Sequence, residues 1–195
     1  MPVPDHLQTR RLLLRRWQAT DAAALQPILE ANTAHLRPWI PRRVAEPVSL
    51  EQLTERLEGF SATFDDGREW RYALFAAEGR TLLGEVSLFP RGASGRVAFD
   101  AADHLEIGYW LRRDATGRGF ATEAARAMLD LATTLPGMAR VTIYCDERNT
   151  SSAAVPSRLG FRLAGAIIES AIVPGEPPTP LQIWEYVLDQ TEPGT

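Results

Sequence analysis

The stretch GRGFATEAAR, residues 117–126, is the part of the sequence that decides the fold. Gly117 and Gly119 stand just before a run of good helix formers that continues to about Leu135. Glycine permits backbone conformations that other residues avoid, and the first N–H groups of a helix have no partner within the helix. These donors lie at the positive end of the helix dipole, so the turn favours an anionic ligand such as a pyrophosphate. The same pattern is also compatible with a plain turn between a strand and a helix.

The helix that follows this turn is predicted to pack against a sheet. Its apolar residues recur every three or four positions and share one face, whereas Glu123, Arg126 and Asp130 fall on the other side. The apolar face consists of Ala121, Ala124, Ala125, Met128, Leu131, Ala132 and Leu135.

Three further motifs accompany the turn, and the set points to a known family. HLEIGYWLRRD (104–114) precedes the turn, and RVTIYCDERNTSS (140–152) and SRLGF (157–161) follow it. In this order the motifs resemble the RimJ/RimL-like branch of the GNAT superfamily of acyl-CoA-dependent N-acetyltransferases, the branch of the ribosomal-protein-alanine acetyltransferases. That branch reads E-I-G-Y-W-L, G-R-G-[YF]-A-T-E-A, N-T-x-S and L-G-F. The opening TRRLLLRRW (9–17) is similar to its first strand, so the resemblance covers about residues 9–188.

Length and composition indicate one globular domain. The 195 residues suit a single GNAT-like domain, residues 1–195, with its core at about 9–188. The formal charge of −4, from 25 acidic and 21 basic residues, argues against electrostatic binding to nucleic acid. We expect a cytoplasmic protein without a membrane partner, because no stretch has the length of a membrane span and the first ten residues lack an apolar signal core. The resemblance implies a monomer or a homodimer.

The single cysteine, Cys145, cannot form an internal disulfide, which favours a reducing compartment. No histidine stands near it in the sequence, so packing within a strand explains this residue better than a role as a nucleophile does.

Hydrophobic periodicity predicts four helices and seven strands. We expect helices at 22–34, from 49 to beyond 60, 120–135 and 151–159, and strands at 11–16, 70–77, 81–89, 104–111, 141–145, 161–168 and 181–188. Residues 1–8 are expected to form a loose arm, and 91–103 and 169–180 to form loops. Pro27 predicts a kink or a late start in the first helix. The resemblance implies an α/β (α+β) fold with a mixed, mostly antiparallel sheet of about six to seven strands, splayed in the middle and flanked by about four helices.

The strand at 104–111 is expected to lie beside the cofactor. Alternation places Glu106, Gly108 and Trp110 on one face and the intervening residues on the other. Gly108 in the middle of the strand marks a bulge or a close backbone approach. The resemblance implies that this strand splays away from the next one, and that the pantetheine arm of acetyl-CoA pairs with the exposed edge.

The resemblance also assigns cofactor-binding residues. Acetyl-CoA would be the acyl donor, with its pyrophosphate held by the backbone N–H groups of residues 118–122 and by the charge of Arg118. Thr116 stands where the family has Gln or Arg, so one side-chain contact to the phosphate would be missing while the backbone contacts remain. No metal is implied. The predicted cofactor-binding residues are Leu111, Arg113, Gly117, Arg118, Gly119, Phe120, Ala121, Thr122, Asn149 and Ser152.

Glu106 is the predicted general base. Acyl transfer requires a neutral amine, and an α-amine with a pKa of about 8 needs less help than a lysine amine with a pKa of about 10.4. The resemblance places Glu106 beside the thioester, where it would act directly or through water. The alternative is that Glu106 only pairs with an arginine on the strand face. Glu85, on the preceding strand, is the second candidate and is predicted to lie in the acceptor site.

The departing thiolate needs a source of protons, and here the sequence departs from the family. Asn149 and Ser152 match Asn-x-x-Ser, a motif that positions the cofactor, and a helix cap alone would also explain them. Many members carry a proton-donating tyrosine where Pro156 stands. Ser152 is therefore the predicted catalytic acid, with solvent as the alternative. Tyr109 and Tyr144 are interpreted as core aromatics.

The most economical function is transfer of an acetyl group from acetyl-CoA to a primary amine, and the branch favours a protein N-terminal α-amine. A small amine such as an antibiotic or a polyamine is the alternative acceptor. Trp39 follows the first helix, where it either faces the acceptor or belongs to the core.

Two other functions are compatible with the same sequence features. The turn at 117–119, with Asp146 further along, loosely imitates a dinucleotide-binding fingerprint, but Thr122 stands where the third glycine belongs. A non-catalytic acyl-CoA sensor of the same fold is the second rival, because Thr116 and Pro156 both depart from the family pattern.

Overall fold

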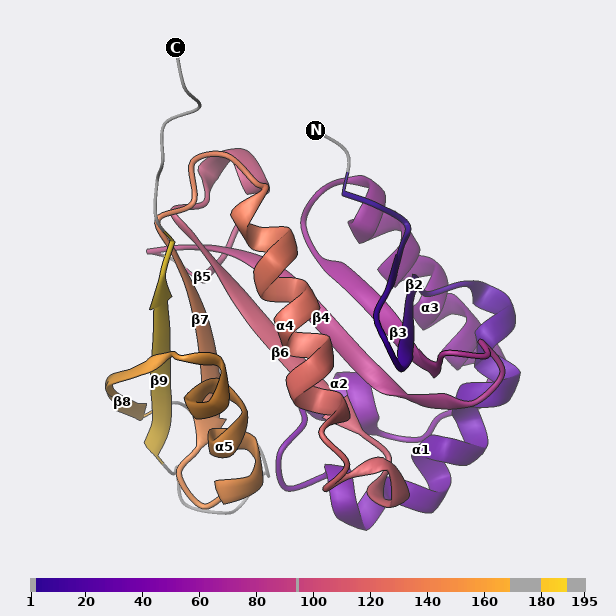
Figure 1. Ribbon diagram of the computed structural model, residues 1–195. Helices are drawn as coiled ribbons and strands as arrows, with labels where there is room; N and C mark the ends of the chain where they lie inside the picture. The colour runs from indigo at the N-terminus through magenta and orange to yellow at the C-terminus, as the bar shows by residue number, and fades with distance from the viewer. Residues whose placement is uncertain (1–2, 94, 169–179, 189–195) are drawn as a thin grey trace.

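Nine strands of the described chain form one mixed sheet (Figure 1). The computed structural model describes residues 3–93, 95–168 and 180–188. The strands lie in the order β1-β2-β3-β4-β6-β7-β9-β8, and β5 pairs with β4 outside this path. They are β1 (His6–Gln8), β2 (Leu12–Arg16), β3 (Trp70–Ala76), β4 (Leu82–Gly92), β5 (Gly95–Arg96), β6 (His104–Leu111), β7 (Arg140–Asp146), β8 (Arg162–Ile168) and β9 (Pro180–Val187).

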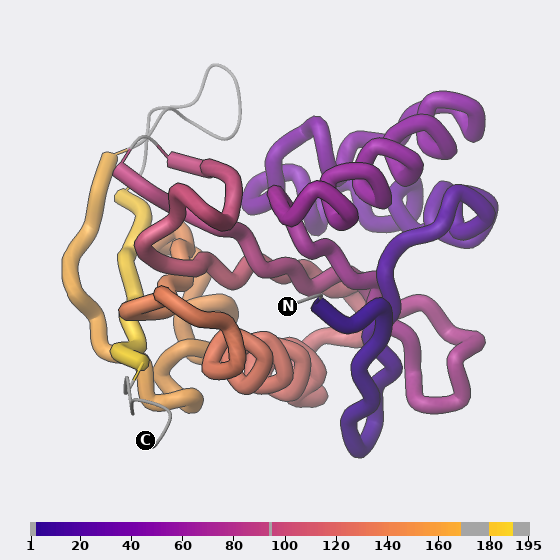
Figure 2. Tube along the Cα trace, turned by 90° about the horizontal axis from the view of Figure 1, so that it is seen from above, coloured from indigo at the N-terminus to yellow at the C-terminus, as the bar shows by residue number. Residues whose placement is uncertain are grey.

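Helices cover both faces of this sheet. Figure 2 shows α1 and α3 on one face and α4 on the other. The ends of these helices follow from their capping residues: the Ser49 side chain accepts a hydrogen bond from the Gln52 N–H before α3, and Gly160, in the left-handed conformation, ends α5. The helices are α1 (Ala22–Leu36), the short α2 (Arg42–Ala45), α3 (Leu50–Asp65), α4 (Phe120–Thr133) and α5 (Thr150–Leu159).

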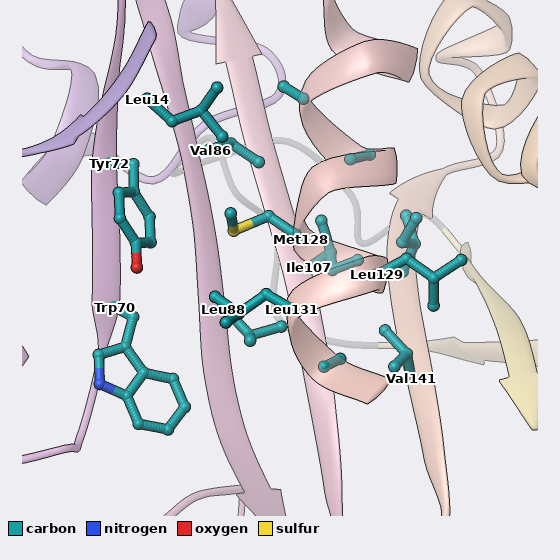
Figure 3. Packing of buried hydrophobic residues seen from close by; sticks show 14 of the residues in the cluster. Leu14, Trp70, Tyr72, Val86, Leu88, Ile107, Met128, Leu129, Leu131 and Val141 are labelled. Carbon is teal, nitrogen blue, oxygen red and sulfur yellow. The ribbon is translucent and has the colours of Figure 1, made fainter. Parts of the chain in front are cut away.

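The main core lies between the sheet and α4. Figure 3 shows Met128 and Leu131 of α4 directed toward Val86, Leu88 and Ile107 of β4 and β6. Met128 is completely buried, so its truncation to alanine would destabilise the fold by about 2–5 kcal/mol. The predicted apolar face of α4 is confirmed. A second core on the opposite face joins the sheet to α1 and α3 through Trp17, Leu25, Leu29, Leu53, Leu57, Phe75 and Trp110.

The sheet splits between β6 and β7. These strands pair in parallel, but the pairing covers only Leu105 with Val141 and Glu106 with Thr142 among the described residues. Beyond this point the two strands separate, and α4 and α5 lie over the separation (Figure 1). The other neighbouring strands of the path are antiparallel, so the prediction of a mixed, mostly antiparallel and splayed sheet is confirmed.

Several local predictions were wrong. The expected loose arm at 1–8 contains β1, which pairs with β2, and the expected loop at 91–103 contains the end of β4, the two-residue β5 and a short 3₁₀ helix (Phe99–Ala101). These short strands raise the count from the predicted six to seven to nine, because tertiary pairing organises segments with little periodicity of their own. The helix α1 starts at Ala22 and continues through Pro27. Most of the expected loop at 169–180 lies outside the described residues.

One of our two interpretations of Gly108 required a bulge in β6. Gly108 forms no bulge against β4. The pairing of β4 with β6 runs from Gly84 to Arg91 without a register shift. The glycine instead allows a close approach, since a Cβ at this position would lie 3.0 Å from Cε2 of Phe89. The neighbour is a side chain and not the predicted backbone.

Candidate active site

A cavity of about 1050 Å³ opens where β6 and β7 separate. Its walls come from the end of β6, the glycine turn, the first turns of α4 and α5, and the end of α1. The lining residues include His35, Trp39, Tyr109, Trp110, Leu111, Gly117, Gly119, Phe120, Ala121, Thr122, Arg126, Arg148, Asn149, Ser152 and Arg158.

The glycine turn has the backbone conformation that the sequence predicts. Gly117 has φ 72° and Gly119 has φ 80°, both in the left-handed region that favours glycine. The helix starts at Phe120, so the N–H groups of its first turn have no intrahelical acceptor, and no side chain caps Gly119 in the described chain. Thr122 Oγ1 is buried beside them without a hydrogen-bond partner among the described residues. The turn therefore offers a set of unused polar atoms and a positive helix end to an anion.

An ion pair fixes this turn to the sheet. Glu123, in the first turn of α4, accepts hydrogen bonds from the backbone N–H of Arg11 at 2.8 Å and from its Nε at 2.6 Å. Thr9 Oγ1 donates to the same carboxylate at 2.6 Å. Arg11 Nη1 also donates to the carbonyl of Arg118, and the guanidinium lies 4.8 Å from the ring centroid of Phe120. Burial raises the pKa of Glu123, but the hydrogen bonds from Thr9 and Arg11 outweigh this effect and lower it.

The start of α5 forms the opposite wall. Asn149 Oδ1 accepts a hydrogen bond from the N–H of Ser152 at 3.1 Å, so its role as the helix cap is confirmed. The Tyr109 hydroxyl donates to the Ser152 carbonyl at 3.0 Å and lies 3.2 Å from Ser152 Oγ. Tyr109 packs against the main core, as predicted, and it also lines the cavity, which was not predicted. Tyr144 is half-buried on β7, with the Arg91 guanidinium 5.7 Å from its ring centroid.

Glu106 lies at the point where the sheet splits. It pairs with Thr142 across the last β6–β7 contact and is buried. Arg91 forms an ion pair with it, in which Nε and Nη2 both contact Oε2. The sequence left open whether Glu106 acts as a base or pairs with an arginine. The pair with an arginine is present, and it uses Oε2 of the Glu106 carboxylate.

Glu85 lies deeper, inside a network of buried polar groups. Its carboxylate accepts hydrogen bonds from Arg71 Nη1 at 2.7 Å, Trp17 Nε1 at 2.8 Å and Ser87 Oγ at 3.1 Å. Arg71 also pairs with Glu69, and its side chain is only 2% exposed. Three donors already occupy Glu85, which favours a structural role over the acceptor-binding role that we predicted.

Trp39 lines the cavity beyond the end of α1. The Arg148 guanidinium is 5.9 Å from its ring centroid, and Arg148 forms an ion pair with the buried Asp146 at 2.9 Å. His35 Nε2 is 3.2 Å from the Leu111 carbonyl, which connects α1 to the end of β6.

Not every predicted site residue lines the cavity. Leu111, Asn149, Ser152, Trp39 and the turn residues other than Arg118 do. The four predicted residues absent from the lining in the described structure are Arg118, Arg113, Glu106 and Glu85. Glu106 and Glu85 share with Trp110 the face of the sheet toward α1 and α3, and Arg113 and Arg118 are exposed. The Arg118 guanidinium is 5.1 Å from the Phe120 ring centroid, so its predicted contact with the pyrophosphate stays a prediction.

Four arginines of the cavity lining were not predicted. Arg11, Arg126, Arg148 and Arg158 add positive charge to the lining. Arg126 and Arg158 stand on the polar faces of their helices, where arginine is common at solvent-exposed positions and carries no signal of its own. Only the assembled fold brings them to one cavity.

Neither a cysteine nucleophile nor a metal site is supported by the described residues. Cys145 is buried, and burial raises the pKa of its thiol, which is the opposite of what an activated nucleophile needs. No group of three or more His, Cys, Asp or Glu side chains in the described ranges is placed to hold a metal ion. None of the helices described here combines the length and apolar character that crossing a bilayer requires.

Comparison with known proteins agrees with this geometry. The sequence model of the acetyltransferase (GNAT) domain matches residues 11–162. A relative in Bacillus subtilis (strain 168), named "Probable N-acetyltransferase YjcK", is 25% identical over 181 residues, which are 92% of each chain.

Two of the solved structures that share the fold illustrate the likeness. RimJ of Mycobacterium smegmatis, solved with CoA-disulfide, has a TM-score of 0.75 and 26% identity, over 94% of this chain and 85% of that one. RimL, a ribosomal L7/L12 α-N-protein acetyltransferase solved with coenzyme A, has a TM-score of 0.78 and 20% identity, over 96% and 98% of the two chains. The family match covers most of the sequence, and the motif order is that of the RimJ/RimL-like branch. The chain therefore belongs to the GNAT acetyltransferase family, in its RimJ/RimL-like branch.

Proposed function

We propose that this acyl-CoA-dependent N-acetyltransferase moves the acetyl group of acetyl-CoA to the α-amine of a protein N-terminus. The observation that carries the proposal is the single cavity that joins the glycine turn at α4 to the split between β6 and β7 and to Trp39 beyond α1. A donor bound at the turn and an acceptor bound at Trp39 would meet at the split.

The residues at the turn fit the donor. The first-turn N–H groups of α4 and Thr122 Oγ1 supply unused hydrogen-bonding groups for a pyrophosphate. Arg11, whose Nη1 donates to the Arg118 carbonyl, adds positive charge beside the turn. Beyond Glu106 the side of β6 that faces β7 has no partner strand among the described residues, whereas the other side pairs with β4. The backbone groups on the unpaired side are available to the amides of the pantetheine arm.

Glu106 suits the part of base in this proposal. Arg91 contacts Oε2, which leaves Oε1 for the amine or for one water molecule. The ion pair holds the carboxylate in one orientation at the split, directly beside the place where the thioester would lie. A base of ordinary strength is sufficient for an α-amine, whose pKa is about 8.

The relatives support the choice of acceptor. The name of RimL describes a protein α-N-acetyltransferase, and its fold covers nearly the whole of this chain. The aromatic ring of Trp39 and the polar groups at the mouth of the cavity suit an extended peptide better than a fully apolar amine.

The proposal is tested by thiol release from acetyl-CoA with a panel of acceptors. The panel contains peptides with a free N-terminus, the same peptides with a blocked N-terminus and one lysine, and a polyamine. We expect turnover with the free N-terminal peptides, and a drop in kcat of roughly 10²-fold or more for Glu106→Gln. Glu58→Gln, on the exposed side of α3, is the matched control and should behave as the wild type.

Each other result has a defined meaning. Turnover on the polyamine alone would replace the protein acceptor by a small amine. Tight binding of acetyl-CoA without turnover on any amine would favour a sensor, and failure to bind acetyl-CoA would reject the proposal.

A further inference from the structure

Pro156 leaves one carbonyl of α5 without its usual helical partner. In an α-helix the N–H of residue i+4 donates to the carbonyl of residue i, and proline has no N–H. The Ser152 carbonyl therefore receives no hydrogen bond from position 156. It accepts one from the Tyr109 hydroxyl instead, at 3.0 Å. The proline in α5 and the tyrosine in β6 thus form one arrangement, which holds a phenol group against the first turn of α5.

Tyr109 and Glu106 face opposite sides of the sheet. Tyr109 packs on the side of α4 together with Leu105 and Ile107, whereas Glu106 lies on the side of α1 and α3 with Trp110. The amine would reach the split from the side of Glu106. The leaving sulfur would then depart on the side of Tyr109 and Ser152.

The position of Tyr109 along β6 also places it near the path of the acyl donor. An acyl donor that starts at the glycine turn and ends at the split must pass along β6 from Leu111 toward Glu106. Tyr109 lies between these two residues, beside the cavity, and Ser152 Oγ is 3.2 Å from its hydroxyl. The first turn of α5 adds the positive end of a helix dipole at the same place.

We propose that the Tyr109 hydroxyl turns its single hydrogen from the Ser152 carbonyl to the sulfur of acetyl-CoA as the carbon–sulfur bond breaks. Ser152 Oγ, 3.2 Å away, would donate its own hydrogen to the phenol oxygen and so orient it. This inference rests on the proposed function. In the reaction the amine nitrogen forms a bond to the acetyl carbon, and the electron pair of the broken carbon–sulfur bond stays on sulfur. The proton lost by the amine passes through Glu106 to solvent, and the thiolate takes a proton from solvent after it leaves. The hydroxyl stabilises the developing charge and is itself unchanged.

The surroundings of Tyr109 suit a donor that keeps its hydrogen. Burial raises the pKa of the phenol above its usual range, and this effect exceeds the opposing effect of the hydrogen bond with Ser152. The hydroxyl consequently stays protonated over the whole range in which the enzyme would work. A phenol with a raised pKa is a poor acid but a permanent hydrogen-bond donor.

The test compares Tyr109→Phe with Tyr186→Phe in the full chain. Tyr186, on β9, packs against Phe161 with ring centroids 5.4 Å apart, away from the cavity lining, and serves as the control. We expect Tyr109→Phe to lower kcat roughly 10- to 100-fold and to leave the KM for acetyl-CoA within about twofold. A second readout is the pKa of the thiol of bound CoA, followed by the ultraviolet absorbance of the thiolate. It should rise by about one in the variant, because the thiolate loses a donor.

A double variant separates this role from a structural one. Tyr109→Phe also leaves the Ser152 carbonyl unpaired, and Pro156→Ala restores an N–H at the helical position that can pair with it. If Tyr109 only satisfied that carbonyl, Tyr109→Phe/Pro156→Ala would recover the wild-type kcat. We expect the double variant to recover the stability of the wild type. Its kcat should stay as low as that of Tyr109→Phe, and the pKa of the thiol of bound CoA should stay above the wild-type value.

The outcomes distinguish the two proposals. A wild-type protein that transfers acetyl groups, with kcat and bound-thiol pKa unchanged in Tyr109→Phe, would overturn the role of Tyr109 alone. Recovery of kcat in the double variant would overturn it as well. A wild-type protein that fails to bind acetyl-CoA would overturn the proposed function and this inference with it.

Discussion

Glu123 Oε2 lies 2.6 Å from Arg11 Nε, which joins two residues that are 112 positions apart in the sequence. Through this pair the glycine turn is attached to the beginning of β2. Arg11 extends the connection to the carbonyl of Arg118 within the turn. The conformation of the glycine turn therefore depends on a contact from the other end of the chain as well as on its glycines.

We expect Glu123→Ala to loosen the turn. The change removes hydrogen bonds from Thr9 and from two nitrogens of Arg11, and hydrogen bonds to partly buried charged groups contribute about 1.5–3 kcal/mol each. The free energy of unfolding should fall by about 2 kcal/mol in urea titrations. Acetyl-CoA should bind about tenfold more weakly by calorimetry, because the loop must be ordered upon binding.

Glu30→Ala, on the exposed side of α1, is the control for this experiment and should alter neither quantity. A Glu123→Ala protein with the wild-type Kd for acetyl-CoA would show that the turn keeps its conformation without the ion pair.

Glu85 is expected to stabilise the folded state. Its replacement by alanine leaves Trp17 Nε1 and the buried Arg71 without one of their acceptors, and breaking a buried ion pair costs about 3 kcal/mol or more. Glu85→Gln keeps an acceptor oxygen and should cost less. Chemical denaturation measures both changes. A fully folded Glu85→Gln protein whose kcat is lost would instead restore Glu85 as the base.

The sequence predicts the elements and the motif residues of the site because both are local properties. Apolar spacing along α4 and the left-handed glycines at 117 and 119 are each specified within a few residues. The partners of charged residues are different. Arg91 beside Glu106, and Arg11 beside Glu123, have no local signal, since any arginine on a strand is equally compatible with solvent exposure.

The place of Tyr109 in the cavity lining was missed for the same reason. Its alternation within β6 indicates the face on which it lies, but the depth of the split and the carbonyl freed by Pro156 become visible only in the fold. Likewise β1 and β5 form because neighbouring strands offer pairing groups, and not because their own residues favour strands.

Stability should decrease in acid through Glu69. Burial raises the pKa of this carboxyl, but Arg71 and Arg96 outweigh this effect and bring it below the ordinary value of 4.5. A carboxylate with a lowered pKa stabilises the folded state above its unfolded-state pKa, and this contribution disappears as the pH falls through the folded-state pKa. We expect Glu69→Gln to be less stable than the wild type at neutral pH, and the difference to disappear as the pH falls through the lowered folded-state pKa of Glu69.

Urea titrations from neutral to acidic pH measure this difference. Glu58→Gln on the exposed side of α3 should follow the wild type at every pH. A difference between Glu69→Gln and the wild type that stays constant with pH would exclude the ion pairs as its source.

Replacing each of three glycines by alanine separates the cost of backbone strain from the effect on acetyl-CoA binding at the turn. Gly117, Gly119 and Gly137 have φ of 72°, 80° and 80°, so each substitution places alanine in the left-handed region at about 1–2 kcal/mol. An added Cβ meets nothing within 4 Å at Gly117 or Gly137, whereas at Gly119 it lies 3.3 Å from Nη2 of Arg11. Only the substitution at Gly119 must also displace the arginine that holds the turn.

Gly137, beyond the far end of α4, is thus a control with matched strain. We expect all three variants to lose similar stability in urea, and Gly137→Ala to keep the wild-type Kd for acetyl-CoA. Gly117→Ala should bind more weakly, and Gly119→Ala most weakly, by roughly tenfold or more. If Gly119→Ala bound acetyl-CoA as tightly as Gly137→Ala does, the pyrophosphate would have to be held somewhere other than this turn, because neither the left-handed backbone nor Arg11 would then matter for binding.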